Sequence, residues 1–130
     1  MSRRTVLILV LLGLLTSPAM RPARAEDAKT VSLTIDYGDG VQKRFTAIKW
    51  TDSMTIADML AFAAKHPRGI KFEKRGSGST ALLLQIDDVK NGTGDRYWIY
   101  EVNGKEGDRS YALVKLAAGD SILWKFAKYQ

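Results

Sequence analysis

The sequence predicts an α+β fold, in which a single helix packs on one face of a mixed or antiparallel sheet. Apolar and polar residues alternate in several short segments, as in half-buried strands, whereas the segment after Thr55 has its apolar residues at helical spacing. Turns that contain glycine separate these segments, and their order along the chain is strand, strand, helix and then several strands. A sheet that holds one helix in this succession is a β-grasp-like arrangement.

The first predicted hairpin has the cleanest strand pattern of the chain. Apolar residues occupy every second position from Val31 to Tyr37, with serine, threonine and aspartate between them. Gly38-Asp39-Gly40 is predicted to be a turn, because glycine adopts the positive φ that tight hairpin turns require. A return strand is expected over 42–50. The sequence does not decide which face of this strand is buried, because two pairs of residues compete for the buried positions: Phe45 with Ala47, and Ile48 with Trp50.

The helix has clear sequence signals at both ends. Thr55 is a preferred N-cap residue, and Asp58, three residues later, completes a capping box. Met54 and Met59 stand at the positions of a hydrophobic staple, and Pro67 marks the end of the helix. The apolar stripe expected to face the sheet consists of Ile56, Met59, Leu60, Ala63 and Ala64.

Further strands are expected after the helix. A short one covers 70–74, another spans the leucine-rich stretch that follows Ala81, and a third runs from Tyr97 to Val102. The last strand follows a Gly119-Asp120 turn. In these strands the core-facing residues are predicted to be Leu82, Leu84 and Ile86, then Trp98, Tyr100 and Val102, and finally Ile122, Trp124 and Phe126.

Residues 1–25 are predicted to be a secretory signal peptide, and 26–130 the domain that remains. Arg3 and Arg4 precede an apolar run over 6–15, and Ala23-Arg24-Ala25 is a small-x-small cleavage site. The alternative is a membrane anchor, but the apolar run is only about half of the ~20 residues that cross a bilayer. The paired arginines resemble a twin-arginine export signal, whereas the strongly apolar run fits the general secretory route. We therefore expect a secreted or periplasmic protein with no transmembrane anchor after signal removal.

Charge and cysteine content argue against a nucleic-acid-binding protein and against a disulfide-stabilised domain. The sequence carries 20 basic and 14 acidic residues, and the predicted leader holds four arginines and no acid, so 16 − 14 leaves a net charge of +2. This small excess disfavours nucleic-acid binding. The chain has no cysteine, so an exported domain of this size must be stabilised by its apolar core.

Three motifs resemble those of the transcobalamin-like C-terminal domain family. They are Thr55 at the helix start, Tyr-Trp-x-Tyr-x-Val-Asn-Gly over 97–104 and Leu-x-x-Gly-Asp-x-Ile-x-Trp over 116–124. The family includes bacterial exported domains of unknown function and is similar to the small β-domain of transcobalamin and intrinsic factor. The resemblance covers nearly all of 31–129. It implies a cobalamin-like, corrinoid ligand, approached by Tyr97, Trp98, Ser110, Tyr111 and Ala112. In the animal carriers a helical domain holds the other face of cobalamin, so this sequence is expected to supply at most half of such a site.

No catalytic or metal constellation is predicted, so we expect a protein that is not an enzyme. The single histidine, His66, is expected at the helix end, where the helix dipole favours it. Asp87 and Asp88 are adjacent on a predicted strand, so they point to opposite faces and are interpreted as solvated surface residues. No twelve-residue calcium loop is present, and no metal ligands are predicted.

The strand aromatics carry the functional hypothesis. Trp98, Tyr100, Trp124 and Phe126 are either core residues or a platform at the end of the sheet, beside the polar loop 105–110, that stacks on a flat ligand or contacts a protein partner. Two functions follow: a non-enzymatic binding module for a small planar or corrinoid molecule, or an extracytoplasmic module that docks on an envelope or cell-surface protein without a small-molecule ligand.

Overall fold

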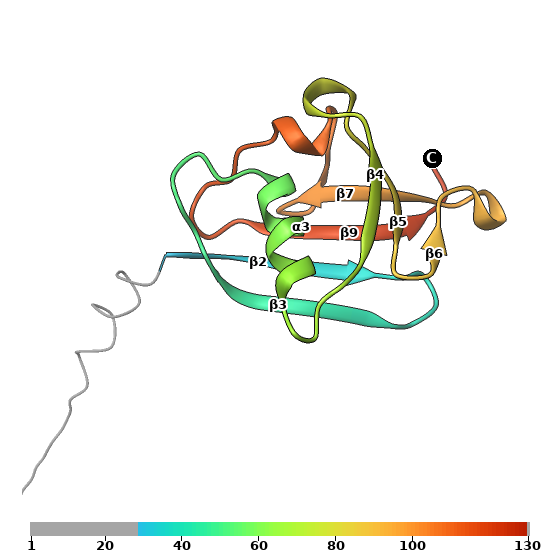
Figure 1. Ribbon diagram of the computed structural model, residues 1–130, viewed down its shortest axis with the longest axis horizontal. Coiled ribbons are helices and arrows are strands. Elements are labelled where there is room, and N and C mark those ends of the chain that lie inside the picture. Colours follow the sequence, from blue (N-terminus) through green and yellow to red (C-terminus); the bar gives the residue numbers. More distant parts are fainter. Residues whose placement is uncertain (1–28, 130) are drawn as a thin grey trace, which may run out of the picture.

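The computed structural model describes residues 29–129. The predicted signal peptide and its cleavage site lie outside these residues. The described chain is a mixed α+β structure made mostly of strands, with one α-helix (Figure 1). Its strands are β2 (Thr30–Asp36), β3 (Gln42–Lys49), β4 (Phe72–Arg75), β5 (Leu82–Ile86), β6 (Val89–Lys90), β7 (Tyr97–Val102), β8 (Lys105–Glu106) and β9 (Ser121–Ala127). Its helices are α3 (Ile56–Lys65) and the 3-10 turns η1 (Gly78–Thr80), η2 (Thr93–Asp95) and η3 (Tyr111–Leu113).

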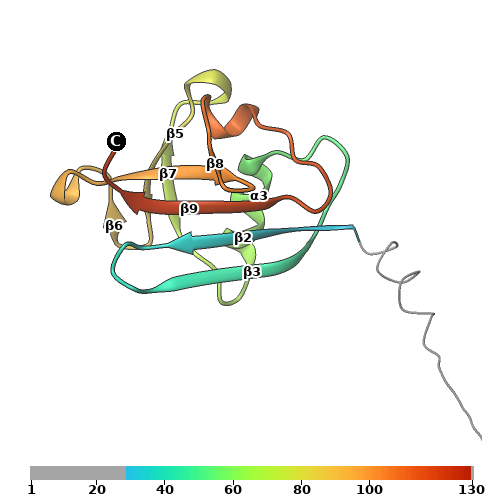
Figure 2. The ribbon, with the colours of Figure 1, turned by 180° about the vertical axis from the view of Figure 1, so that it is seen from behind.

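The strands form two sheets. The larger has five strands in the order β3-β2-β9-β7-β8, with β2 and β9 parallel and the other neighbours antiparallel. The smaller is the antiparallel sheet β4-β5-β6. The helix and the smaller sheet lie on the same face of the larger sheet, and β4 and β5 run across its strands (Figure 1). Seen from behind, the larger sheet lies in front of both (Figure 2).

The helix begins as its sequence predicts. The Thr55 hydroxyl accepts a hydrogen bond from the Asp58 N–H at 3.2 Å, and the Asp58 carboxylate accepts one from the Thr55 N–H at 2.9 Å. This reciprocal capping box satisfies two backbone donors at the helix start. The predicted stripe is correct except for Ala64, which is exposed. The part of this ten-residue helix that the rest of the protein covers is narrower than its apolar stripe. Only Ile56, Met59, Leu60 and Ala63 are buried.

The core lies between the larger sheet and the layer formed by the helix and the smaller sheet. Strands β2 and β9 bury every second residue, which confirms the alternation read from both segments. The largest fully buried side chains are Leu33, Ile35, Ile48, Ile56, Met59, Leu60, Leu83, Ile86 and Ile122. Within residues 29–129 no helix has the length and apolar character needed to cross a membrane.

A bulge resolves the ambiguous facing of β3. Two steps along β2, from Val31 to Leu33, correspond to three steps along β3, from Ile48 to Phe45. The extra residue shifts the inward face by one position, so Phe45 and Ile48 are both buried, and Ala47 takes a positive φ of 59°. Each of the two competing assignments was therefore half correct.

A second bulge makes the prediction for β5 wrong. The pairing moves from Glu73 with Gln85 to Lys74 with Leu83, so β5 has one residue more than β4 at this point. Leu83 and Ile86 are buried as a result, whereas Leu82 is 42% exposed and Leu84 is only half-buried. Strict alternation predicted Leu82, Leu84 and Ile86, because it cannot include an inserted residue.

Candidate functional site

A cavity of about 360 Å³ lies beside β7 and β9. Three predicted ligand residues line it, namely Trp98, Ser110 and Tyr111. Tyr100 and Trp124, for which the sequence left the core and a ligand platform as alternatives, complete its aromatic wall. The η1 region and the segment 106–111 form the opposite sides. A second hollow of about 620 Å³ shares Tyr100, Glu106, Gly107 and Arg109 with it.

Tyr100 holds the 106–111 segment in place. Its hydroxyl donates a hydrogen bond to the Arg109 carbonyl at 2.6 Å, and its own carbonyl accepts one from the Gly107 N–H at 3.0 Å. Gly107 lies directly against the Tyr100 ring, where a Cβ atom would collide with the ring. This close approach explains why a glycine follows the two-residue strand β8.

Ser110 connects the two sides of the cavity. Its Oγ lies 2.7 Å from the Gly78 carbonyl oxygen and 3.2 Å from that of Ala81, so its hydrogen is directed at the η1 backbone. The same oxygen accepts from the Ala112 N–H at 3.3 Å. Ser110 therefore positions η1 against η3, and its hydroxyl is already occupied.

Two residues that line the cavity each have a buried polar atom without a partner. Tyr111 is 3% exposed and Trp124 is 2% exposed, and their rings meet edge to face at 5.4 Å between centroids. Within residues 29–129 neither the Tyr111 hydroxyl nor the Trp124 Nε1 has a hydrogen-bond partner. Burial raises the pKa of Tyr111, which keeps its hydroxyl protonated and able to donate at neutral pH.

Trp98 has a different role in the same wall. Its Nε1 donates to the Val89 carbonyl at 2.9 Å, and its ring packs against Tyr37 and Phe126. It presents an apolar surface to the cavity while its polar atom binds the β6 backbone. Trp98 therefore fits the core interpretation and the ligand interpretation equally.

Tyr97 and Ala112 do not line the cavity. Tyr97 points to the other face of β7 and stacks on Tyr129, with 5.2 Å between ring centroids and 25° between ring planes. Tyr129 itself lines the cavity. Ala112 is half-buried and packs against the core. The structure thus brings three of the five predicted residues together and leaves two beside them.

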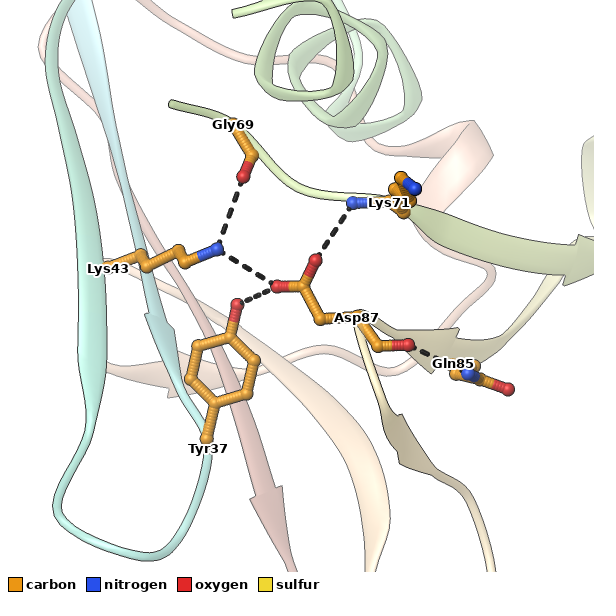
Figure 3. A network of polar contacts seen from close by, with 6 residues as sticks. All are labelled: Tyr37, Lys43, Gly69, Lys71, Gln85 and Asp87. Carbon is orange, nitrogen blue, oxygen red and sulfur yellow. Dashed lines mark hydrogen bonds and ion pairs between the residues drawn. The ribbon is translucent and has the colours of Figure 1, made fainter. Parts of the chain in front are cut away.

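A second polar cluster surrounds Asp87, which directly follows β5 (Figure 3). Asp87 accepts hydrogen bonds from the Tyr37 hydroxyl at 2.5 Å, the Lys43 ammonium at 3.1 Å and the Lys71 N–H at 3.0 Å. Lys43 also donates to the Gly69 carbonyl at 3.2 Å. We call these residues the Asp87 node. It joins the β2–β3 hairpin to the chain after the helix and to the β5–β6 turn.

The Asp87 node corrects the interpretation of the Asp87-Asp88 pair. Asp88 is exposed, as expected, whereas Asp87 lies in the β5–β6 turn and is only partly exposed. Burial by itself would raise the pKa of Asp87, but the bonds from Tyr37, Lys71 and Lys43 outweigh it and lower that pKa. Burial, followed by the bond and the charge of Asp87, raises the pKa of Tyr37.

His66, the remaining polar candidate, stabilises local structure at the helix end. His66 lies at the helix end, as expected, and its Nδ1 accepts from the Arg68 N–H at 3.1 Å. Among residues 29–129 there is no cluster of three or more histidine, cysteine or acidic side chains that could hold a metal ion.

Sequence comparison decides the family of this chain. The model of one family matches residues 62–128, which is just over half of the 130 residues and includes the whole cavity lining apart from Tyr129. The chain belongs to the DUF4430 family. This family is described as a domain of unknown function. No curated protein matches the chain.

Two solved structures share the fold of this DUF4430 chain. One is a protein from Ruminococcus gnavus ATCC 29149 described as a candidate metal-binding protein, with a TM-score of 0.62 and 14% identity over 78% of this chain and 99% of that chain. The other is haptocorrin in complex with Cbi, with a TM-score of 0.61 and 15% identity over 78% of this chain. The DUF4430 chain spans only 25% of the haptocorrin chain. At these identities the likeness concerns the fold, and it agrees with the fold that the transcobalamin-like motifs implied.

Sequence reasoning on this DUF4430 chain missed part of the cavity. For Tyr100 and Trp124 the sequence left the core and a ligand platform as alternatives, and the two residues are both buried and part of the cavity wall. Gly107 and Arg109 lie in the loop 105–110, which was expected beside the aromatic platform but from which only Ser110 was predicted as a site residue. The glycine in that stretch was the one available signal, because a glycine beside an aromatic strand often marks a close backbone approach.

Proposed function

We propose that this chain is an exported, non-enzymatic binding domain that holds a small ligand in the cavity beside β7 and β9. The observation that carries this proposal is the cavity itself, about 360 Å³ with an aromatic wall and two unpaired polar atoms. A concave, mostly apolar site with a few polar groups is the usual form of a small-molecule site.

A corrinoid is the first ligand to test. The fold likeness to haptocorrin in complex with Cbi supports this choice, as do the transcobalamin-like motifs. In this proposal the mixed sheet and its helix form a β-grasp-like arrangement. Trp98, Ser110 and Tyr111 line the site, while Tyr97 and Ala112 support it from beside. A whole corrin is larger than the cavity, so its ring would lie across the opening and the neighbouring hollow that Tyr100 and Gly107 share.

Equilibrium dialysis of residues 26–130 against cobalamin and cobinamide, followed by the corrin absorbance, tests this proposal. Leu82 lines the cavity and is 42% exposed, so Leu82→Glu should fold and weaken binding. Val41→Glu is the matched control, because Val41 is 53% exposed and lines no described pocket. No bound corrin at high micromolar concentration, or equal loss in both variants, would reject the corrinoid proposal.

Export is part of the same proposal. The leader pattern at residues 1–25 supports it, and the mature protein should begin at Glu26. Mass spectrometry of the protein recovered from the culture medium or periplasm tests this start point. A retained leader in all fractions would argue against a removed signal.

A second candidate function, docking on an envelope or cell-surface protein, has one observation in its favour. Large apolar side chains are exposed at Val41, Phe62, Leu82, Leu113 and Tyr129. A pull-down from envelope extract should then recover one dominant partner, and a Leu113→Glu variant should lose it. Recovery of the same proteins by both forms would reject specific docking at Leu113.

A further inference from the structure

Unpaired polar atoms are rare in protein interiors because they lose hydrogen bonds to water and gain none in return. The other two indoles of this chain follow that rule. Trp50 Nε1 donates to the Leu116 carbonyl at 2.8 Å, and Trp98 Nε1 donates to the Val89 carbonyl at 2.9 Å. Trp124 Nε1 has no such partner among residues 29–129, and neither has the hydroxyl of Tyr111 beside it.

Both orphan groups belong to one cavity wall. Tyr111 and Trp124 both line the 360 Å³ cavity, and their rings are in contact edge to face. One water molecule needs roughly 10–15 Å³ of such space, so this volume is many times larger. The cavity therefore has room for a polar ligand group next to the two residues that carry these donors.

The charges around the cavity restrict what that group can be. The ionisable side chains in its lining, apart from the tyrosines, are Glu106 and Arg109, which have opposite signs. Both are exposed, and the Arg109 Nε already pairs with Asp108 at 3.0 Å. The two buried groups are a protonated phenol and an indole, which are neutral donors. An anion bound there would lose its hydration without gaining a buried cation, whereas a carbonyl oxygen would gain donors at little desolvation cost.

We infer that the cavity takes an uncharged carbonyl group, an amide above all, with the Tyr111 hydroxyl and the Trp124 Nε1 as its hydrogen-bond donors. This inference deepens the proposed function and rests on it, because it assigns ligand chemistry to the same site. Corrinoids carry primary amide side chains, so a corrin lying across the opening would have a suitable group to insert. Any other ligand with an exposed amide carbonyl meets the same requirement.

In this inference, the two donors become accessible to the ligand when the η1 side of the cavity moves. Neither atom has exposed surface in the structure, so a ligand group must displace part of the wall. The residues from Gly78 to Leu82 form one short turn that is exposed except for Ala81. The Ser110 hydroxyl fastens this turn to η3 through the Gly78 and Ala81 carbonyls. Ser110 is thus a positioning residue for the wall and not a donor to the ligand.

Indole N–H resonances test the inference directly. Residues 26–130, labelled with ¹⁵N, would be titrated with N-methylacetamide to high millimolar concentration, and with sodium acetate in parallel. Trp124→Phe identifies the Trp124 signal by its loss. We expect that signal to move saturably with the amide and not with acetate, while the Trp50 and Trp98 signals stay in place because their donors are occupied.

Two variants that each lose one hydroxyl complete the test. Tyr111→Phe should weaken amide binding about fivefold, the value of one ordinary hydrogen bond. Tyr37→Phe removes a hydroxyl outside the cavity and should bind the amide as the parent does. The inference is overturned if the three indole signals move alike, if acetate moves the Trp124 signal as strongly as the amide, or if Tyr111→Phe binds as tightly as the parent.

These outcomes are separate from those of the corrinoid dialysis. A Trp124 response without bound corrin rejects a corrinoid as the ligand but supports the inferred carbonyl site. Bound corrin without a Trp124 response supports the proposed binding function and rejects the carbonyl site at Tyr111 and Trp124.

Discussion

The Asp87 node and the cavity wall each contain a buried tyrosine, but the two hydroxyl groups have opposite environments. The Tyr37 hydroxyl donates to a carboxylate that accepts two further hydrogen bonds. The Tyr111 hydroxyl is more deeply enclosed and has no partner within the described residues. A satisfied polar group stabilises a fold, whereas an unsatisfied one costs free energy unless something else binds it. The first region therefore stabilises the fold, whereas the second has the features expected of the proposed binding site.

The two regions also differ in what they connect. The Asp87 node ties the β2–β3 hairpin of the larger sheet to the turn of the smaller sheet (Figure 3). The cavity lies where the 106–111 segment and η1 meet, and one serine hydroxyl spans that junction. Fewer polar bonds cross the cavity than cross the node, so the cavity side should open more readily.

Loss of Asp87 should give the largest effect. Asp87→Ala removes the acceptor of three hydrogen bonds and leaves the Tyr37 hydroxyl without its partner, so the free energy of unfolding should fall by about 3 kcal/mol. Urea denaturation followed by tryptophan fluorescence measures this. Asp88→Ala is the matched control and should change little, because Asp88 is exposed. Equal losses in the two variants would mean that the node does not stabilise the fold.

Tyr37→Phe should have the next largest effect. It removes one hydrogen bond to a charged acceptor and keeps the ring that packs on Trp98, so a loss of about 2 kcal/mol is expected. In a double-mutant cycle with Asp87→Asn, the two losses should be strongly non-additive. Additive losses would show that the short Tyr37–Asp87 contact contributes no stability of its own.

Tyr111→Phe should act in the opposite direction. Because the hydroxyl is buried and unpaired, its removal should raise the free energy of unfolding by about 1 kcal/mol in the absence of ligand. The same denaturation experiment on both tyrosine variants compares the two regions directly. A destabilised Tyr111→Phe protein would indicate a bound partner for this hydroxyl and would remove the contrast between the regions.

Protonation of Asp87 at low pH should give the smallest effect on the free energy of unfolding. The pKa of Asp87 is lowered in the folded state from its ordinary value of 3.8, so its ionised form stabilises the fold. That contribution is fully present above the unfolded pKa and is lost as pH falls through the lower folded pKa. Asp87→Asn should therefore flatten the dependence of stability on pH below about 4, as measured by denaturation at a series of pH values. An unchanged slope would mean that Asp87 is not the carboxylate responsible.

Local patterns were sufficient to predict a large part of this protein. The alternation in β2 and β9, the capping box at Thr55 and Asp58, and the α+β order all depend on residues close in sequence. Backbone geometry alone relates such residues, because side chains alternate on a strand and repeat every three to four positions on a helix. The resemblance to the transcobalamin-like family also directed attention to Trp98, Ser110 and Tyr111, which line the cavity.

Only the tertiary structure could decide which strand faces are buried and which polar atoms have hydrogen-bond partners. The bulges in β3 and β5 depend on how partner strands pair, so no alternation within one segment could predict that Phe45 and Ile48, or Leu83 and Ile86, are buried together. Likewise, Asp87 meets Tyr37 from 50 positions away, whereas Tyr111 meets no acceptor in the described chain. Hydrogen-bond satisfaction depends on contacts between segments distant in sequence, and those contacts exist only once the chain has folded.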